Sequence, residues 1–494
     1  MITYFVAFLF ALMVGAAATV VVRNRALKYG WVDRVKDSRK IHSRPIPRLG
    51  GIALVTGFYA PLAALLVVDS SVGQTFRSSP EVVLGLFLGG SVIAALGVYD
   101  DFRGADALKK FTVQFMVAGA LYALGFRVDQ IHNPFGPPIE LGYAALPFTL
   151  FWIVGVINAM NLIDGLDGLA GGVAFFAIGT NFILALARGE VLMSLMMASL
   201  AGSVLGFLIF NFNPASIFMG DTGSMFLGFV LAAVSLKTSQ KAGAAVAMVV
   251  PVIALGLPIM DTLLAMVRRA LLGRPMFSAD KEHIHHRLMS RLVLTQRRAV
   301  LVLYGICCLF GLTALGLAYA NSAQSALLLA GVSIVVGVLM RKLGYLNLGD
   351  AGQVGQVRKR NVQLRAVVKD VSAQLSQADS FEAVWLAVRP VAELLDAARL
   401  ELKLDRRAPG ANDAVVFETQ RPAGSALPLE VRVDVKDGDA GLGQLLLDWR
   451  DGRGEVNRDE ELALELLADA IGRAAAGVLA RAAADPSRVV AMRK

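Results

Sequence analysis

The feature that most constrains this chain is a series of long apolar runs that covers its first 340 residues. We count about eleven such runs, each near the ~20 residues that a helix needs to cross a bilayer. Because a backbone in lipid must satisfy its own hydrogen bonds, these runs predict an all-α polytopic membrane domain. They lie near residues 3–22, 52–68, 81–99, 110–126, 145–161, 168–187, 192–210, 223–238, 243–267, 300–319 and 324–340.

Composition agrees with this interpretation and excludes several classes. The 494 residues are 56% hydrophobic and only 18% charged, which is too apolar for a soluble protein of this length. The net charge of +9 indicates basic cytoplasmic loops and anionic lipid or substrate rather than nucleic acid. Cys307 and Cys308 are adjacent in an apolar run, so we interpret them as packing residues. The apolar run at 1–22 is followed by Arg23 and not by a small-residue cleavage site. This favours a first membrane span over a removed signal peptide.

The loops between the runs alternate in charge. Most Lys and Arg lie in the loops at 23–48, 100–110, 158–167, 211–221 and 268–298 and after residue 341. The positive-inside rule places these loops and the C-terminus in the cytoplasm and the N-terminus outside. Every motif-like polar segment lies in these same loops. We therefore expect a multi-pass membrane protein whose polar motifs and C-terminal domain lie on the cytoplasmic side.

The chain changes character after Gly344. Residues 353–377 are polar with apolar residues at seven-residue spacing, which indicates a helical linker, either a short coiled coil or a plain amphipathic helix. A soluble α/β domain is then predicted from a helix at 381–395, strands at 398–404, 413–419, 429–435 and 444–449, and a helix at 459–481. The predicted domains are 1–342 in the membrane, a linker at 343–379, an α/β domain at 380–485 and a tail at 486–494.

The polar segment from Asn158 to Gly172 lies between two apolar runs. Asn158, Asn161, Asp164 and Asp167 place two amides and two carboxylates within ten residues. Polar groups at a membrane boundary are costly, and by default they are candidates for function. The alternative is a plain polar hairpin between two spans.

Adjacent carboxylates end the third run. Asp100 and Asp101 point about 100° apart on a helix, so one could ligate a metal or polarise a nucleophile while the other holds a neighbouring base or amide. Lys110 follows at the start of the fourth run and could hold a phosphate. The alternatives are a solvated helix end for the carboxylates and a snorkelling lysine.

Two further loops carry glycines beside charged residues. Arg48-Leu49-Gly50-Gly51 could bind phosphate through Arg48 and the glycine N–H groups, or could serve only as a basic membrane anchor. Gly220 and Asp221 open the eighth run, where a helix N-terminus favours anions and open N–H groups suit phosphate oxygens. A carboxylate there suits Mg²⁺ shared with substrate phosphates, and a helix N-cap is the alternative.

Three of the five histidines lie in one cytoplasmic loop, Asp280-Lys281-Glu282-His283-Ile284-His285-His286-Arg287. If this segment is helical, His283 and His286 share a face. Zinc is an alternative on ligand type, but no cysteine is near and the chain has no second histidine pair. We prefer a clamp for substrate phosphates or a nucleotide.

These motifs together resemble the polyprenyl-phosphate N-acetylhexosamine-1-phosphate transferases, a group of the glycosyltransferase family 4 type. The resemblance covers about residues 1–342. The motifs are Arg48-Leu49-Gly50-Gly51, Asp100-Asp101, Asn158-x-x-Asn161-x-x-Asp164-Gly165-x-Asp167-Gly168, Phe218-Met219-Gly220-Asp221-Thr222-Gly223-Ser224 and His283-x-His285-His286-Arg287, in that order.

The resemblance implies a reaction. A polyprenyl phosphate, expected to be undecaprenyl phosphate, attacks the β-phosphate of a UDP-N-acetylhexosamine and gives a polyprenyl-diphospho-sugar and UMP. The His-x-His-His-Arg form favours GlcNAc as the sugar. Such transfer initiates cell-surface polysaccharide synthesis, for example of O-antigen, which implies a location in the bacterial inner membrane with the active site on the cytoplasmic side. We favour direct attack over an aspartyl-phosphate intermediate.

The resemblance also implies roles for the site residues. Asp221 and Asn161 would hold Mg²⁺, with Mn²⁺ as an alternative metal. Catalytic roles fall to Asp100, Asp101, Asp164 and Asp167, with Asp100 as the base or orienting group for the lipid phosphate. The expected substrate-binding residues are Arg48, Lys110, Asn158, Gly220, His283, His285, His286 and Arg287.

The C-terminal domain departs from the minimal family pattern. Its element order resembles a GAF-type sensory domain, which implies regulation or a homodimer. Two other functions stay open: a phospho-MurNAc-pentapeptide transferase, and a membrane transporter or sensor with a cytoplasmic regulatory domain. A transporter more often has an internal repeat and polar groups near the midplane. Here the polar groups lie at span ends on one side.

Overall fold

The computed structural model describes residues 1–33, 46–68, 70–131, 137, 139–240, 248–276, 282–345, 351–405, 414–420, 428–438, 440–454 and 456–484. The basic loop at 34–45, Asp280 and the predicted tail lie outside the described residues. The chain forms two compact units. The first comprises Met1–Val267 and Phe277–Asn347, and the second comprises Arg268–Met276 and Leu348–Lys494. Each has its own hydrophobic core.

The first unit is helical. Its helices are α1 (Ile2–Tyr29), α2 (Gly50–Ala64), α3 (Ser71–Arg77), α4 (Pro80–Arg103), α5 (Ala107–Ala123), α6 (Ala145–Ile163), α7 (Leu169–Ala187), α8 (Val191–Asn211), α9 (Gly220–Gln240), α10 (Val249–Ala254), α11 (Gly256–Leu272, whose last residues belong to the second unit), α12 (Ile284–Arg291), α13 (Gln296–Tyr319) and α14 (Ser322–Lys342). The short strands β1 (Val32–Asp33) and β2 (Ile46–Pro47) pair, as do β3 (Gln130–Ile131) and β4 (Ile139–Glu140), which precedes the 3-10 turn η1 (Gly142–Ala144).

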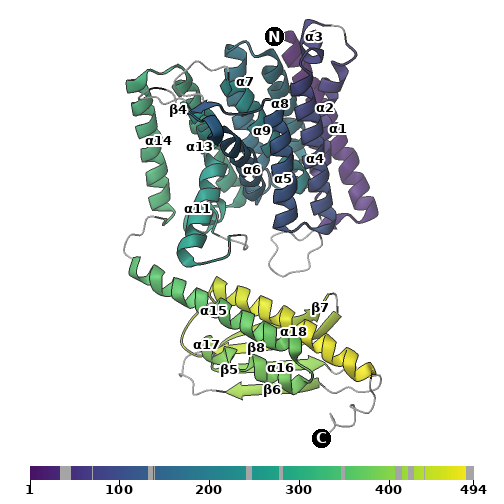
Figure 1. Ribbon diagram of the computed structural model, residues 1–494, viewed down its shortest axis with the longest axis vertical. Helices are drawn as coiled ribbons and strands as arrows, with labels where there is room; N and C mark the ends of the chain where they lie inside the picture. Colours follow the sequence, from purple (N-terminus) through teal and green to yellow (C-terminus); the bar gives the residue numbers. More distant parts are fainter. Residues whose placement is uncertain are drawn as a thin grey trace. The chain divides into compact units, whose positions relative to one another are not determined.

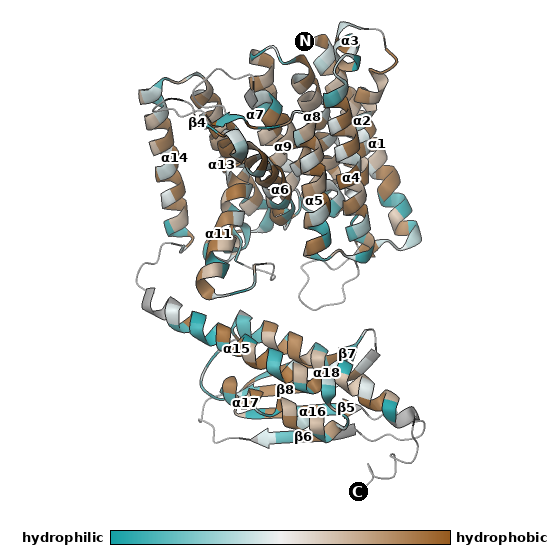
Figure 2. Cartoon of the chain, in the orientation of Figure 1, coloured by the Kyte–Doolittle hydropathy of each residue, from teal (hydrophilic) through white to brown (hydrophobic). Residues whose placement is uncertain are grey.

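The apolar runs of the sequence coincide with these helices. The run at 243–267 differs, because its described part forms two helices, α10 and α11, with a break at Leu255. Seven helices within the described ranges are long and apolar enough to cross a membrane. The total of eleven crossings stays a prediction, since α2, α5 and α11 have only 15, 17 and 17 residues. Figure 2 shows apolar residues along most of these helices and hydrophilic ones near several helix ends.

Helix α9 lies at the centre of the first unit and contacts α2, α4, α6 and α7 (Figure 1). Glycines allow the close approach at its N-terminal end. A Cβ added to Gly51 would lie 2.1 Å from the Gly223 nitrogen, and one on Gly97 would lie 2.3 Å from the Thr222 Cα. Because such overlaps cannot be relieved by rotating a side chain, glycine is required at both positions. This packing brings the loop before α2 and the end of α4 to the start of α9.

The second unit contains a four-stranded antiparallel sheet, in the order β6-β5-β8-β7. Helices α15 and α18 lie side by side, and α18 contacts β7 and β8 (Figure 1). The elements are α15 (Ala351–Gln377), α16 (Phe381–Val388), α17 (Val391–Leu394), β5 (Arg399–Asp405), β6 (Ala414–Gln420), β7 (Leu429–Asp437), β8 (Ala440–Trp449) and α18 (Arg458–Ala484).

The predicted strands and the closing helix of this unit are therefore confirmed within a few residues. The helix expected at 381–395 is instead two helices, because the chain turns at Arg389–Pro390. In α15, Leu364, Val368, Val371 and Leu375 are buried in the core of the same unit, which is the pattern of an amphipathic helix. The GAF-like identity of this unit stays a prediction.

Candidate active site

A lysine and two aspartates from three helices meet at one end of the first unit. The Nζ atom of Lys110, on α5, lies 2.6 Å from Asp221 Oδ2 on α9 and also contacts Asp100 Oδ2 on α4. Asp100 also accepts a hydrogen bond from the backbone N–H of Ala105. The side chain of Asp100 is 11% exposed and that of Asp221 is 29% exposed. The Lys110 ammonium therefore lies between two carboxylates that solvent can still reach.

Asp101 has different hydrogen-bond partners from its neighbour Asp100. Its Oδ1 accepts the Asp221 N–H at 2.9 Å, and its Oδ2 accepts the N–H and the hydroxyl of Thr222 at 3.1 Å and 2.6 Å. Both oxygens are thus bonded to the first turn of α9, in the manner of an N-cap supplied by another helix. The sequence indicated that one carboxylate of the pair could hold an amide, and the structure places Asp101 in that position.

The loop that contains Arg48 lies against the segment before α9. The N–H groups of Gly50 and Gly51 donate to the carbonyls of Phe218 and Met219. The expectation that these N–H groups bind phosphate is therefore wrong, because the backbone of the neighbouring loop already accepts them. The same holds for the N–H of Asp221, which donates to Asp101.

Gly220 is needed where these two loops meet. It adopts a φ of 70°, and a Cβ there would lie 2.2 Å from the Arg48 carbonyl oxygen and 2.7 Å from the Asp101 carboxylate. Any other residue would carry both backbone strain and a clash. Gly220 therefore allows the Arg48 loop and Asp101 to approach the start of α9.

The two asparagines of α6 differ in their surroundings. Asn161 lies beside the side chain of Asp221 and donates to Ser224 Oγ at 3.0 Å. Asn158 donates to Gln114 Oε1 at 2.6 Å and to the carbonyl of Val154, one turn earlier, at 2.7 Å. Asn161 thus belongs to the cluster around Asp221, whereas Asn158 joins α6 to α5.

Asp164 and Asp167 follow α6 and also differ. Asp167 is buried, and its Oδ2 accepts Asn213 Nδ2 at 2.9 Å and the Ala215 N–H at 3.0 Å, so it holds the loop between α8 and α9. Asp164 is partly exposed. Burial, together with the negative charges of Asp221, Asp101 and Asp167, raises the pKa of Asp164 to about 7. The negative charges of Asp221 and Asp101 therefore act on the Asp164 carboxyl group.

The histidine segment lies against the same loop. A Cβ on Gly165 would meet His285 Nε2 at 2.6 Å, so the ring of His285 packs directly on the Asp164–Gly165 backbone. His285 is 3% exposed, and burial with the nearby His286 lowers its pKa to about 3. Its ring lies 5.8 Å from that of His283 and 4.3 Å from that of His286. The histidines thus form one group beside the carboxylates.

The local conformation of this segment corrects the sequence interpretation. Helix α12 begins at Ile284, and His283 is its extended N-cap with a ψ of 155°. The helical face that His283 and His286 were expected to share is therefore absent. Arg287 bonds Glu282 Oε2 at 2.5 Å and the Leu343 carbonyl at 3.0 Å, and its guanidinium lies 4.0 Å from the Tyr345 ring. Arg287 accordingly joins α12 to the end of α14.

Two residues that the sequence motifs did not indicate, Asp261 and Gln114, also contact the site residues. Asp261, on α11, bonds His283 Nδ1 at 2.8 Å and the Ile284 N–H at 2.8 Å. Gln114, on α5, is buried and accepts from Asn158. A carboxylate within an apolar run was the available signal for Asp261, because such groups are rarely without a partner.

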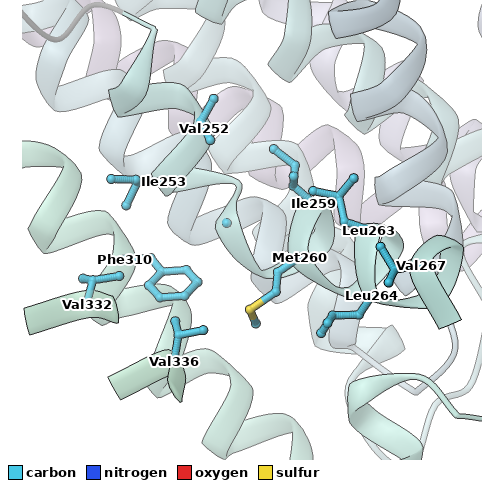
Figure 3. A pocket seen from close by; sticks show the side chains of 11 residues that line it. Val252, Ile253, Ile259, Met260, Leu263, Leu264, Val267, Phe310, Val332 and Val336 are labelled. Carbon is cyan, nitrogen blue, oxygen red and sulfur yellow. The ribbon is translucent and has the colours of Figure 1, made fainter. Parts of the chain in front are cut away.

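An apolar groove of about 350 Å³ lies between α10, α11, α13 and α14. Figure 3 shows Met260, Phe310, Val332 and Val336 converging on this space. Met260 is the neighbour of Asp261 on α11. One helix thus lines an apolar groove and also contacts the histidine group.

A divalent cation fits the carboxylate cluster on chemical grounds. Asp100, Asp221 and Asn161 supply hard oxygen atoms, which are the ligands that Mg²⁺ prefers. The ammonium of Lys110, bonded to Asp221 and Asp100, is a positive charge at the position that such an ion would take. No group of three or more His, Cys, Asp or Glu with metal-binding geometry occurs in the described parts of the chain. A bound ion would therefore need further ligands from substrate phosphates or water.

Comparison with known proteins identifies the family of this chain. Residues 83–239 match the family Glycosyl transferase family 4. The chain is 38% identical over 348 residues to the probable undecaprenyl-phosphate N-acetylglucosaminyl 1-phosphate transferase of Bacillus subtilis, covering 70% of this chain and 94% of that one. It is 36% identical to the decaprenyl-phosphate N-acetylglucosaminephosphotransferase of Mycolicibacterium smegmatis, covering 68% and 87%. It is 33% identical to a phospho-N-acetylmuramoyl-pentapeptide-transferase of Listeria monocytogenes, over 44% and 68%. The chain belongs to glycosyl transferase family 4.

Proposed function

We propose that this protein transfers GlcNAc-1-phosphate from UDP-GlcNAc to a polyprenyl phosphate, giving polyprenyl-diphospho-GlcNAc and UMP. The observation that carries the proposal is the contact chain from Lys110 through Asp221 and Asn161 to the Asp164–Gly165 loop and His285. It joins a carboxylate–lysine cluster to a histidine group at one end of a membrane domain. Phosphoryl transfer requires mainly positioning and charge neutralisation, which such groups provide.

The transfer proceeds by direct attack. An oxygen of the lipid phosphate forms a bond to the β-phosphorus of UDP-GlcNAc while the bond from that phosphorus to the UMP oxygen breaks. A phosphate monoester has a second pKa near 6, so most of the acceptor is already a dianion at pH 7 and needs no strong base. The carboxylate of Asp100 is held by Lys110 and Ala105. Asp100 therefore orients Lys110 toward the phosphate instead of forming an aspartyl-phosphate.

Charge neutralisation falls to Lys110 and the residues around it. Asp221 and Asn161 would hold Mg²⁺, which would supply positive charge to the diphosphate. Substrate phosphates draw the Lys110 ammonium away from the two carboxylates, because they carry more negative charge. His285 stays neutral at physiological pH and contacts the donor as a hydrogen-bonding group, while His286 and Arg48 contribute to the donor pocket.

The prenyl chain of the acceptor lies in the apolar groove beside Met260 and Phe310. The groove is bounded by side chains without charge, and α11 connects it directly to the histidine group through Asp261. A polyprenyl chain there would remain in an apolar environment while its phosphate reaches the cluster of Lys110. The cytoplasmic orientation of this end follows from the positive-inside rule.

The second unit regulates the transferase. It contains residues 268–276, which include the last residues of α11. Within this unit, the Arg274 guanidinium makes two bonds of 2.8 Å and 2.7 Å to Asp459. Asn361 adds a bond of 3.0 Å to the Leu272 carbonyl. A GAF-like sensory domain that changes shape would thereby move the helix that carries Asp261.

An exchange assay tests the function. The full-length protein in nanodiscs is incubated with radiolabelled UMP and UDP-GlcNAc, with undecaprenyl phosphate and Mg²⁺ each present or omitted. We expect label in UDP-GlcNAc only when both are present. Exchange with UDP-MurNAc-pentapeptide but not with UDP-GlcNAc would favour the pentapeptide transferase, which the Listeria relative makes the second candidate. No exchange with either donor would overturn the enzyme assignment and favour a transporter or sensor.

A further inference from the structure

Asp261 is a buried carboxylate in the interior of an apolar helix. Its residue is 2% exposed, and it lies on α11 among residues that line the apolar groove. A carboxylate is costly to bury unless hydrogen bonds compensate for the lost water. Both of its oxygens have such a bond, and both bonds go to the histidine segment.

The first of these bonds fixes the start of α12. This helix has only eight residues, and its N-cap residue, His283, makes no capping bond with its own side chain. Asp261 Oδ1 instead accepts the Ile284 N–H at 2.8 Å. A carboxylate at a helix N-terminus satisfies an otherwise unpaired donor and interacts favourably with the helix dipole. Asp261 therefore determines where α12 begins.

The second bond fixes the orientation of a histidine ring. Asp261 Oδ2 lies 2.8 Å from His283 Nδ1, so the carboxylate accepts the proton on that nitrogen. In the neutral ring, a proton on Nδ1 leaves Nε2 as an acceptor, and Nε2 faces away from Asp261. The ring is parallel to that of His285 within 4° at a centroid distance of 5.8 Å. His285 in turn packs on Gly165, so a series of contacts joins Asp261, through His283 and His285, to the loop between α6 and α7.

We propose that Asp261 is a positioning residue for sugar-phosphate transfer, which sets the tautomer of His283 and the start of α12 so that the histidine group meets the UDP-sugar. This inference rests on the proposed function, because it assumes that the histidine group contacts the donor. Asp261 acts only through His283 and Ile284, and it touches no substrate.

The variant Asp261→Asn separates the two bonds. An asparagine can still accept the Ile284 N–H through its carbonyl oxygen, so α12 keeps its cap. Its amide nitrogen is a donor, so His283 must now present a bare Nδ1 and carry its proton on Nε2. Asp261→Ala removes both bonds, and Asp261→Glu restores an acceptor of the same charge.

The experiment uses the full chain in nanodiscs with UDP-GlcNAc and undecaprenyl phosphate. We expect Asp261→Asn to lower kcat/KM for UDP-GlcNAc about 10²-fold, with the KM for undecaprenyl phosphate unchanged. Asp261→Glu should recover part of the loss. In a His283→Gln background, Asp261→Asn should add little further loss, because its effect passes through His283. Nitrogen-15 NMR of labelled histidine should show the His283 proton moving from Nδ1 to Nε2.

Two results would overturn the inference. One is an equal loss from Asp261→Asn with and without His283, since that means Asp261 acts independently of the ring. The other is an unchanged His283 tautomer in the variant. The tautomer measurement needs no donor, so it is informative even if the wild-type protein fails to use UDP-GlcNAc and the proposed function is wrong. Thermal unfolding of each variant shows whether a loss of rate is a loss of fold.

Discussion

Two groups of aspartates lie at the same end of the membrane domain and have opposite surroundings. Asp101, Asp167 and Asp261 are bonded to backbone or side-chain N–H groups of other segments. Asp100 and Asp221 share the ammonium of Lys110 and remain partly open to solvent. The first group can hold loops and helix ends in place, whereas the second can exchange its cation for a metal or release it to a phosphate. A carboxylate in a motif therefore identifies a site but not its own role, which depends on the donors around it.

Replacing Asp221 should have the largest effect. Asp221→Asn keeps the size and a hydrogen bond but removes the negative charge that would hold Mg²⁺. We expect UMP exchange to fall at least about 10³-fold, with little change in the thermal unfolding temperature. Isothermal titration calorimetry with Mg²⁺ should show that the variant binds the ion more weakly than the wild-type protein does. Full activity of Asp221→Asn would contradict the assignment of this residue to the metal.

Asp101→Ala tests the other group of aspartates. It leaves two N–H groups and the hydroxyl of Thr222 without their acceptor at the start of α9. We expect a loss of stability of about 2 kcal/mol, seen as a lower unfolding temperature, and a fall of about tenfold in exchange. Asp101→Asn is the matched control, and it should recover part of the lost stability and part of the lost exchange activity. A loss of activity as large as that of Asp221→Asn, without a loss of stability, would remove the distinction between the two groups.

Much of the fold follows from the sequence, because its signals are local. Apolar runs near the thickness of a bilayer predicted where helices lie, and alternating patterns predicted the strands of the second unit. The break at Leu255 between α10 and α11 was not visible, since the run is apolar on both sides of it. Segment placement is thus a property of composition, while a break within an apolar run depends on the packing of neighbours.

The candidate site was predicted less completely, because its contacts join distant segments. The motifs indicated Asp100, Lys110, Asn161 and Asp221 as site residues, and these four lie together in the structure. The bonds from the Gly50 and Gly51 N–H groups, which were assigned to phosphate, to the carbonyls of Phe218 and Met219 could not be anticipated from either loop alone. Asp261 was overlooked because its partners at His283 and Ile284 lie 22 and 23 residues away in the sequence. Which donors meet which acceptors is decided by tertiary packing.

Asp164 gives a smaller effect that depends on pH. Its pKa is raised to about 7 by burial and by the charges of the cluster, so it loses its proton as pH rises through about 7. The added negative charge attracts a dication, so Mg²⁺ affinity should increase with pH in this range, and Mg²⁺ binding below pH 7 should release protons. In Asp164→Asn the dependence should flatten, and affinity at pH 8 should fall about fivefold. Calorimetry in buffers of different ionisation enthalpy measures both the Mg²⁺ affinity and the number of protons released on binding. A steep pH dependence that persists in Asp164→Asn would assign the titration to another group.

Arg274 should give the smallest effect, because it lies in the second unit, where it is bonded to Asp459. Its bidentate pair with Asp459 is mostly buried, with side chains 13% and 12% exposed, so removing one partner takes the ion-pair partner from a mostly buried charge. If the second unit acts through α11, Arg274→Glu should change UMP exchange by about threefold, and a charge swap with Asp459→Arg should restore it. Removing residues 348–494 should change exchange in the same direction as Arg274→Glu, because it also leaves residues 268–276 without their partners. Unchanged exchange in both would show that Asp261 holds the histidine group whatever the state of the second unit, and that α11 transmits nothing along its length.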